Sequence, residues 1–172
     1  VDLNDNKYKQ TTDYQFTTID TSNPILLSIS ELKIFNETPG NNIELTFNEF
    51  VKAGPGTIVF RQPELDYLSS YETSSNSLIT INGTVVTIIP PVDFNTNYPV
   101  IIDINSDAFT DVAGNPAAKF LVFFGGAGDD QAQGGDKNDH LLGQEGNDRL
   151  EGGKGSDILN GGEGIDTAIF ND

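Results

Sequence analysis

The chain has 172 residues and a formal net charge of −17, with 26 acidic residues against nine basic ones. A surface of this charge repels nucleic acid and anionic membranes and attracts divalent cations. The chain has no cysteine, which excludes disulfides and thiolate metal sites. No apolar run approaches the roughly 18 residues of a membrane span, and we find no signal peptide. We therefore expect either a piece of a longer chain or export through a signal outside this sequence.

Residues 1–23 are polar and end at a boundary before Pro24. Residues 14–19 alternate like a strand. The string Asp2–Asn6 and the residues after it echo Asp111–Asn115 and the strand after that, at an offset of 109 residues. We interpret residues 1–23 as the tail of a preceding copy of the next domain. The alternatives are a linker and a strand added to the following sandwich.

Residues 24–124 are predicted to be an all-β domain. Short alternating runs separated by turn signals every 8–12 residues or so are typical of a β-sandwich. Asn82-Gly83 between two such runs predicts a hairpin, and Gln62–Asn76, rich in Ser and Tyr, is expected to be a loop. The expected strands are residues 25–35, 43–47, 57–61, 78–81, 85–89, 98–104 and 119–124.

Two runs of this domain, residues 43–60 and 85–117, resemble the bacterial Ig-like repeat of surface-layer proteins and large adhesins. The resemblance implies an Ig-like β-sandwich that acts as a spacer or adhesive module without chemistry of its own. Asp111 and Asn115 are expected to hold a corner turn through side-chain-to-backbone bonds. The residues that fall where the pattern places similar ones are Glu49, Pro55, Tyr98, Phe109, Asp111, Gly114 and Asn115.

Residues 125–169 form five consecutive nine-residue units: GGAGDDQAQ, GGDKNDHLL, GQEGNDRLE, GGKGSDILN and GGEGIDTAI. Glycine opens every unit and aspartate is sixth in every unit. Glycine-rich turns let backbone carbonyls converge, and the aspartate adds a carboxylate. Oxygen-only sites of this kind suit Ca²⁺ better than zinc or copper.

One unit is expected to be half a coil, with a six-residue turn and a three-residue strand whose middle side chain points inward. Successive turns fall on opposite edges, so an ion should bridge turns n and n+2. The coil should grow on the strand at 119–124. The predicted carboxylate ligands are Asp130, Asp139, Asp148, Asp157 and Asp166. The predicted carbonyl ligands belong to Gly126, Gly128, Gly135, Gly143, Glu145, Gly152, Lys154, Gly161 and Glu163.

These units resemble the RTX (repeats-in-toxin) family, whose nonapeptide pattern is GGxGxDxUx. The resemblance implies a parallel β-roll over residues 125–172 that binds about three or more Ca²⁺ ions and folds after type I secretion, outside a Gram-negative-type bacterium. Residues 125–172 carry three bases and eleven acids, a balance of −8. Their few leucines cannot offset about 1–2 kcal/mol of ordering entropy per residue, so metal binding has to supply folding free energy. The alternative is a disordered acidic linker.

Three residues of the repeats stand apart. Lys137 and Gln144 replace glycine at the fourth and second positions of their units, where a turn conformation that glycine takes freely is needed. We expect the site that involves Lys137 to be weaker. His140 is the only histidine, and alternation places it on the outward face, without partners for a zinc site or a catalytic triad.

The sequence as a whole predicts an all-β, non-catalytic, calcium-binding module of a large secreted or cell-surface RTX protein, which we interpret as an adhesin. We expect a monomer within a longer chain, with a host surface, a glycan or a neighbouring domain as candidate partners. One alternative is an accessory region of a secreted RTX enzyme. Another is a calcium-dependent carbohydrate-binding module that uses the aromatic residues Tyr67, Tyr71 and Tyr98.

Overall fold

The computed structural model describes residues 20–30, 42–90, 94 and 97–171. The regular structure of these residues is β, apart from two 3-10 turns at Pro63–Leu65 (η1) and Thr73–Ser75 (η2). The all-β prediction is therefore confirmed. The expected strand at 14–19 and the Asp2–Asn6 string lie outside the described residues.

The first sheet is antiparallel, in the order β1-β2-β7-β6. Strand β2 has the bounds that alternation predicted, and it buries Ile43, Leu45 and Phe47. The predicted hairpin joins β6 to β7, with Gly83 at a φ of 65° that suits a tight hairpin turn. The strands are β1 (Leu26–Ile29), β2 (Ile43–Phe47), β6 (Ile79–Asn82) and β7 (Val85–Ile88).

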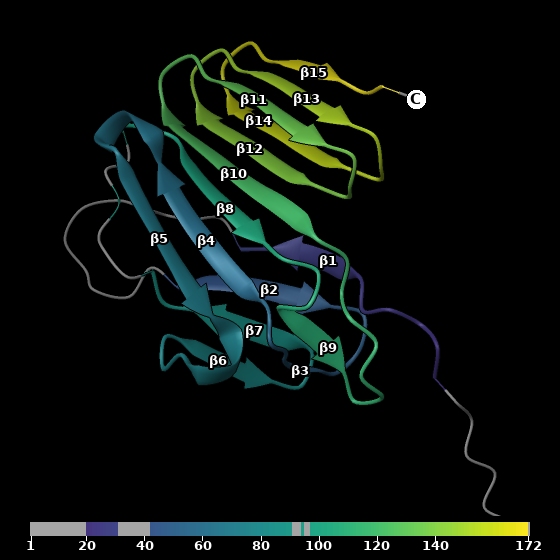
Figure 1. Cartoon of the computed structure of the whole chain (residues 1–172). Helices are drawn as coiled ribbons and strands as arrows, with labels where there is room; N and C mark the ends of the chain where they lie inside the picture. Colours follow the sequence, from purple (N-terminus) through teal and green to yellow (C-terminus); the bar gives the residue numbers. More distant parts are fainter. Residues whose placement is uncertain (1–19, 31–41, 91–93, 95–96, 172) are drawn as a thin grey trace, which may run out of the picture.

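The second sheet has the order β14-β12-β10-β8-β4-β5, antiparallel from β5 to β10 and parallel from β10 to β14. Its antiparallel part faces the first sheet (Figure 1), and we call these two sheets up to β10 the two-sheet region. The strands are β4 (Thr57–Gln62), β5 (Tyr67–Glu72), β8 (Val100–Ile104), β10 (Phe120–Ala127), β12 (His140–Glu145) and β14 (Ile158–Glu163). A short ribbon pairs β3 (Val51–Ala53) with β9 (Phe109–Asp111).

The predicted loop at Gln62–Asn76 was wrong, because it contains the edge strand β5. Only one face of β5 is covered, so the strand needs few apolar residues. Two of the tyrosines proposed for sugar stacking lie on the covered face. Tyr67 packs edge-on against Phe94 and Tyr71 against Phe60, with ring centroids 5.8 and 6.0 Å apart. Of the three candidates, only Tyr98 is exposed, at 38%.

A large apolar core lies between the two sheets, and strand β10 closes one side of it. Phe120, Val122 and Phe124 of β10 point into this core. The alternate residue Phe123 points the other way, into a second and smaller core among the repeats. One strand therefore serves two cores, and the predicted domain boundary between residues 124 and 125 lies inside β10.

The repeat segment (residues 125–169) winds as a parallel coil on top of β10 (Figure 1). One wall is β10, β12 and β14. The other is β11 (Gln131–Gly135), β13 (Arg149–Gly153) and β15 (Thr167–Ile169), in the order β11-β13-β15. The pairing of β10 with β12 agrees with the expected growth on the strand at 119–124.

The eighth position of each unit was expected to point inward. This is so for Ala132, Leu141 and Leu150, which are buried, while Leu159 packs partly buried against them. Ala168 in the last unit is exposed. Strands begin at or next to the seventh position, and four of them continue into the glycines of the following unit, so they exceed the predicted three residues.

Candidate metal centre

Turns that are two units apart stack on one another, with turns one, three and five at one edge of the coil and turns two and four at the other. The N–H of Gly128 donates to Glu145 O, and that of Gly146 to Glu163 O, both at 2.9 Å. At the other edge Lys154 N–H donates to Gly135 O at 2.6 Å. Each hydrogen bond spans about two units, which is one full turn of the coil.

The sixth-position aspartates form a ladder along each edge. Asp148 Oδ1 accepts the N–H of Asp130, and Asp166 Oδ1 accepts that of Asp148, each at 2.9 Å. Asp157 Oδ1 likewise accepts the N–H of Asp139 at 2.9 Å. The structure thus brings together the three pairs of aspartates expected to share ions.

The ladder continues onto the two-sheet region. Asp139 Oδ1 accepts the N–H of Leu121 at 2.8 Å, so β10 takes the place of a preceding turn. Phe123 then occupies the inward position of this extra half-turn, beside Leu141 in the register of β10 and β12. The first turn of this edge is therefore built on a strand that the apolar core already holds.

The second carboxylate oxygen of three aspartates has no partner. Asp130 Oδ2, Asp139 Oδ2 and Asp148 Oδ2 are buried and accept no hydrogen bond. A buried charged oxygen without a partner is costly. These are also the three aspartates that have a stacked turn two units further on. Such orphaned oxygens indicate a group that the fold requires and that the polypeptide does not provide.

Each orphaned oxygen shares a cramped space with a carbonyl of the next stacked turn. A Cβ placed on Gly125 would collide with both Asp130 Oδ2 and Gly143 O. The same holds for Gly134 with Asp139 Oδ2 and Gly152 O. It also holds for Gly143 with Asp148 Oδ2 and Gly161 O. The first-position glycines therefore leave room for a carboxylate oxygen and a carbonyl oxygen close together. The carbonyls belong to Gly143, Gly152 and Gly161, which are three of the predicted carbonyl ligands.

The electrostatics of these oxygens favour a cation. Burial, followed by the charges of Asp148, Glu64 and Asp129, raises the pKa of Asp130 to about 6. Burial also raises the pKa values of Asp139 and Asp148. A hard divalent cation removes this penalty, and carboxylate plus carbonyl oxygens are what Ca²⁺ prefers. The donor set of the repeat segment therefore fits Ca²⁺.

The remaining predicted ligands lie in the same stacked turns. The carbonyls of Gly135, Glu145 and Glu163 accept the inter-turn hydrogen bonds described above. Gly128 O lies against Gly146 of the next stacked turn. Gly126 lies opposite Gln144 in the β10–β12 ladder. Lys154 is exposed in turn four.

The two departures from the glycine pattern behave differently. Gln144 takes the left-handed conformation that its position needs, with a φ of 81°. Lys137 has no positive φ, so the expectation that both residues take the glycine conformation was wrong for Lys137. The backbone of turn two therefore differs from that of the other turns at the fourth position. Lys137 O nevertheless lies against Gly155 of turn four, as the equivalent carbonyls of other turns do.

His140 lies on the face of β12 that points away from the inside of the coil, as alternation predicted, but this face is covered and His140 is only 5% exposed. The face of β12 that looks away from the coil continues the face of β10 that packs into the large core. His140 is therefore covered there beside Val122, its register partner. Burial lowers the pKa of His140, partly opposed by the charge of Asp157.

A second ladder, at the fifth position of the units, was not predicted. Asp129 Oδ1 accepts the N–H of Asn147 at 2.8 Å, and Asn147 Oδ1 accepts that of Ile165 at 2.9 Å. Asn138 Oδ1 does the same for Ser156 at 2.9 Å. The signal was present in the sequence, because four of the five units carry a short polar residue at this position.

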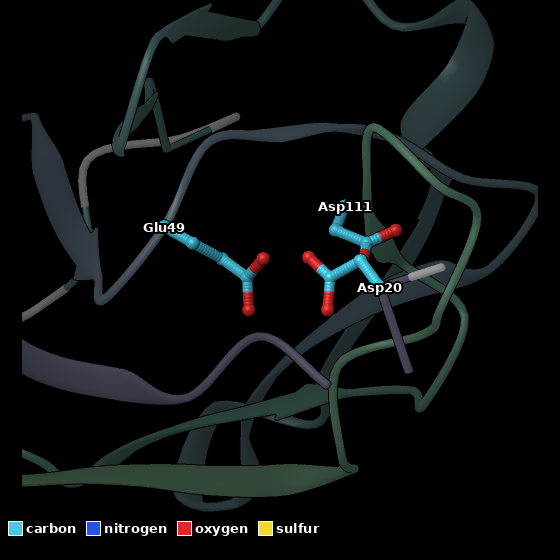
Figure 2. Close-up of side chains that lie close together, drawn as sticks. All are labelled: Asp20, Glu49 and Asp111. Carbon is cyan, nitrogen blue, oxygen red and sulfur yellow. The ribbon is translucent and has the colours of Figure 1, made fainter. Parts of the chain in front are cut away.

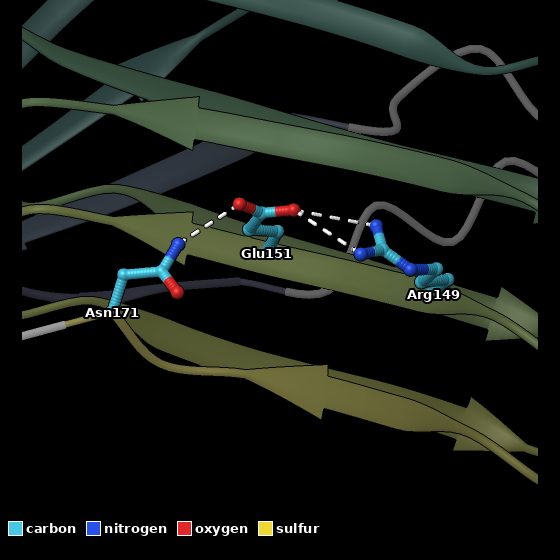
Figure 3. A network of polar contacts seen from close by, with 3 residues as sticks. All are labelled: Arg149, Glu151 and Asn171. Atoms are coloured by element: carbon cyan, nitrogen blue, oxygen red, sulfur yellow. Dashed lines mark hydrogen bonds and ion pairs between the residues drawn. The ribbon is translucent and has the colours of Figure 1, made fainter.

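The outer face of β13 carries a polar network (Figure 3). Glu151 accepts hydrogen bonds from both terminal nitrogens of Arg149 at 3.3 Å and from Asn171 Nδ2 at 2.8 Å. An exposed ion pair of this kind contributes little stability. Its visible consequence is that the residues after β15 return to β13.

Comparison with family models identifies the repeats. Residues 124–159 and 133–168 match the RTX calcium-binding nonapeptide repeat (4 copies). Repeats of this family bind calcium ions, so Ca²⁺ is the cofactor of the repeat segment. Comparisons with curated proteins and with solved structures gave no match. Among the described residues, no helix is long and apolar enough to span a membrane.

Proposed function

We propose that this chain is a non-catalytic, extracellular calcium-binding module whose repeat segment folds when Ca²⁺ binds. The observation that carries the proposal is the set of three buried, unpartnered oxygens of Asp130, Asp139 and Asp148. Each faces a carbonyl of the next stacked turn. In the absence of a cation, the fold would leave three charged oxygens desolvated.

The apolar core of the repeats is too small to replace the ion. Among the described residues it consists of Phe123, Ala132, Leu141 and Leu150. A fully buried leucine contributes about 1.5–3 kcal/mol, whereas ordering each residue costs about 1–2 kcal/mol. Ion binding therefore supplies the difference, and the binding free energy becomes folding free energy.

The two-sheet region supports the repeats and gives them a starting point. We propose that it is an Ig-like spacer of a large adhesin, exported by type I secretion, because RTX repeats are typical of such secreted proteins. Its own core does not depend on the ion, and β10 presents a finished strand on which β12 pairs. Outside the cell, Ca²⁺ at about 10⁻³ M would fill sites with dissociation constants of about 10⁻⁴–10⁻³ M.

The test is a Ca²⁺ titration of EDTA-stripped full-length protein, followed by far-UV circular dichroism and hydrodynamic radius, with Mg²⁺ as the ionic control. We expect a cooperative gain of β signal and compaction with Ca²⁺ alone. Asp148→Asn keeps a hydrogen-bond acceptor but removes the charge that two stacked turns share, and it should weaken the transition. Asp136→Asn is the matched control, because Asp136 is an exposed third-position residue.

A flat titration of the unmodified chain would contradict calcium-driven folding. A transition that Asp148→Asn and Asp136→Asn weaken equally would place the ion elsewhere. The adhesive role needs a separate measurement, in which beads carrying the full chain are tested for retention on host-cell and glycan surfaces in Ca²⁺ and in EDTA. Binding that disappears when Tyr98 is changed to alanine would favour a carbohydrate-binding module.

A further inference from the structure

Three carboxylates converge at the end of the two-sheet region that lies away from the repeats. Asp20 precedes β1, Glu49 lies between β2 and β3, and Asp111 ends β9. Each offers one oxygen to a group in which all three oxygens lie within 4.8 Å of one another. Figure 2 shows the carboxylates of Glu49 and Asp20 facing each other, with the carboxylate of Asp111 next to that of Asp20. Segments far apart in the sequence thus bring three negative charges together.

Asp111 is the fixed member of the group. Its side chain is only 1% exposed. Asp111 Oδ1 accepts the N–H groups of Gly114 at 2.5 Å and Asn115 at 2.7 Å, and Oδ2 accepts Asn115 Nδ2 at 2.6 Å. Burial alone would raise the pKa of Asp111, but these hydrogen bonds outweigh it and lower the pKa. The predicted corner turn is confirmed, and its hydrogen bonds favour the ionised form of Asp111.

Glu49 supplies the observation that points to a missing ligand. Its Oε1 atom is buried and accepts no hydrogen bond, and its carboxylate lies beside those of Asp20 and Asp111. Burial, then the charges of Asp20 and Asp111, raises the pKa of Glu49. None of the three forms an ion pair with a base in the part of the chain that the structure describes. A carboxylate that has a buried, unpartnered oxygen and lies beside two other carboxylates lacks its counter-charge.

Asp20 connects the group to the segment that enters the domain. Its Oδ1 accepts the N–H of Ser22 at 2.9 Å. Its backbone carbonyl accepts Asn115 Nδ2 at 3.0 Å, the same amide that holds Asp111. The entering segment is therefore already attached to the corner turn. A cation among the three carboxylates would add a second and stronger attachment.

We propose that Asp20, Glu49 and Asp111 bind a Ca²⁺ ion that is separate from the ions of the repeats. The donors are all hard oxygens, with no histidine or cysteine, which selects Ca²⁺ over zinc or copper. Water completes the coordination, since three carboxylates supply fewer than the six to eight oxygens that the ion takes. The site would fix residue 20 against β9.

The experiment uses the full chain and its Glu49→Gln variant, which keeps the shape of the side chain and removes its charge. Bound Ca²⁺ is counted by equilibrium dialysis, and the amide resonances of Gly114 and Asn115 are followed by NMR during the titration. We expect one ion fewer in the variant, or that ion bound roughly tenfold or more weakly. The two amide resonances should shift with Ca²⁺ in the unmodified chain and not in the variant.

Glu44→Gln is the matched control, because Glu44 is an exposed carboxylate on the neighbouring strand β2. It should leave both the ion count and the shifts unchanged. Asp20→Asn is a second variant with an exposed side chain, so its effect does not depend on repacking a core. The proposal is overturned if Glu49→Gln and Asp20→Asn bind as many ions as the unmodified chain, with unchanged affinity and unchanged amide shifts.

This test is distinguishable from that of the repeats. Glu49→Gln should leave the Ca²⁺-driven compaction of the repeat segment intact, whereas Asp148→Asn should weaken compaction and leave the shifts of Gly114 and Asn115 in place. A structural role for Glu49 without an ion would show as a loss of stability that is the same in Ca²⁺ and in EDTA. The proposal predicts a difference that appears only when Ca²⁺ is present.

Discussion

The two-sheet region and the repeat segment are both built of strands and share β10, yet different forces hold them. Among the described residues, eighteen buried apolar residues form the core between the two sheets, against four in the core of the repeats. The repeats instead bury the carboxylates of Asp139 and Asp148, which are each 2% exposed. Removing apolar area from water stabilises the first region, and on the proposed function ion binding stabilises the second.

The difference teaches how a short coil can depend on an ion and still fold in register. On the proposed function, the first part of β10 forms without the ion, because Phe120, Val122 and Phe124 anchor it in the large core. It then offers β12 a parallel edge, and it offers Asp139 the N–H of Leu121. The ion-dependent part therefore begins on an ion-independent template.

The largest effect is expected from a cavity in the two-sheet core. Phe60 on β4 is 2% exposed and stacks on Phe94 with ring centroids 5.8 Å apart. Phe60→Ala should cost about 3–5 kcal/mol, and the loss should be the same with and without Ca²⁺. Chemical denaturation in both conditions measures it. A loss that Ca²⁺ largely removes would contradict the separation of the two regions.

A smaller effect is expected when the space around an ion-facing oxygen is filled. The added methyl of Gly143→Ala would collide with Asp148 Oδ2 and Gly161 O. Overpacking costs about 1–3 kcal/mol, so the Ca²⁺ concentration at the folding midpoint should rise by roughly tenfold. The exposed residue Asn160 on β14 provides a control, Asn160→Ala, which should leave the midpoint unchanged. Equal midpoints for both variants would argue against the site.

The next effect concerns pH and has opposite signs with and without the ion. The pKa of Asp130 in the fold, about 6, lies above its ordinary value of 3.8. Without Ca²⁺, protonation in the folded state stabilises the repeats below about pH 6, and this stability is lost as the pH rises through 6. With Ca²⁺ the proton competes with the ion, so lowering the pH from about 7.5 to 5.5 should weaken binding about fourfold at the site that Asp130 contributes to.

Two titrations check the pH dependence. Circular dichroism in EDTA follows the ion-free repeats between pH 4 and 8. This range spans the ordinary pKa of Asp130, 3.8, and its pKa in the fold, about 6. Isothermal calorimetry at both ends of the range gives the Ca²⁺ affinity and the protons released. Asp130→Asn should reduce the pH dependence of both curves, and the raised pKa values of Asp139 and Asp148 account for what remains. A Ca²⁺ affinity that increases toward acidic pH would contradict the assignment of carboxylate ligands.

The smallest effect separates the two departures from the glycine pattern. A left-handed conformation costs a residue other than glycine about 1–2 kcal/mol. Replacing that residue by glycine removes this cost, but glycine itself loses about 0.5–1 kcal/mol more conformational entropy on folding. Gln144→Gly should therefore stabilise the repeats by about 0.5 kcal/mol. Lys137→Gly should give no gain, because Lys137 has no positive φ. Thermal unfolding in saturating Ca²⁺ measures the difference, and a larger gain for Lys137→Gly would reverse the interpretation.

Much of this architecture follows from local pattern. Strand β2 and the β6–β7 hairpin were predictable because alternation and Asn82-Gly83 act within a few residues. The strand β5 was missed because its Ser- and Tyr-rich alternation serves an edge with one covered face. The burial of His140 was missed for a tertiary reason, since it depends on β12 continuing the sheet of the neighbouring region.

The candidate site was predictable in its residues and less so in its geometry. The nine-residue period identifies the aspartates and the stacking of alternate turns. It does not reveal that one oxygen of four of the five aspartates accepts an N–H of a neighbouring turn or of β10, as Asp148 Oδ1 does from Asp130. It also cannot bring together Asp20, Glu49 and Asp111, because they come from three segments that only the folded sheets place side by side.

The most direct test of the account is hydrogen exchange of the full chain, read residue by residue in Ca²⁺ and in EDTA. The account predicts that amides of β12 to β15 are protected in Ca²⁺ and exchange freely in EDTA. Amides of β2, β4 and β8 should stay protected in both, and those of β10 should lose only part of their protection. Repeats that remain protected in EDTA, or a two-sheet region that loses protection with them, would contradict the claim that an ion holds one region and an apolar core the other.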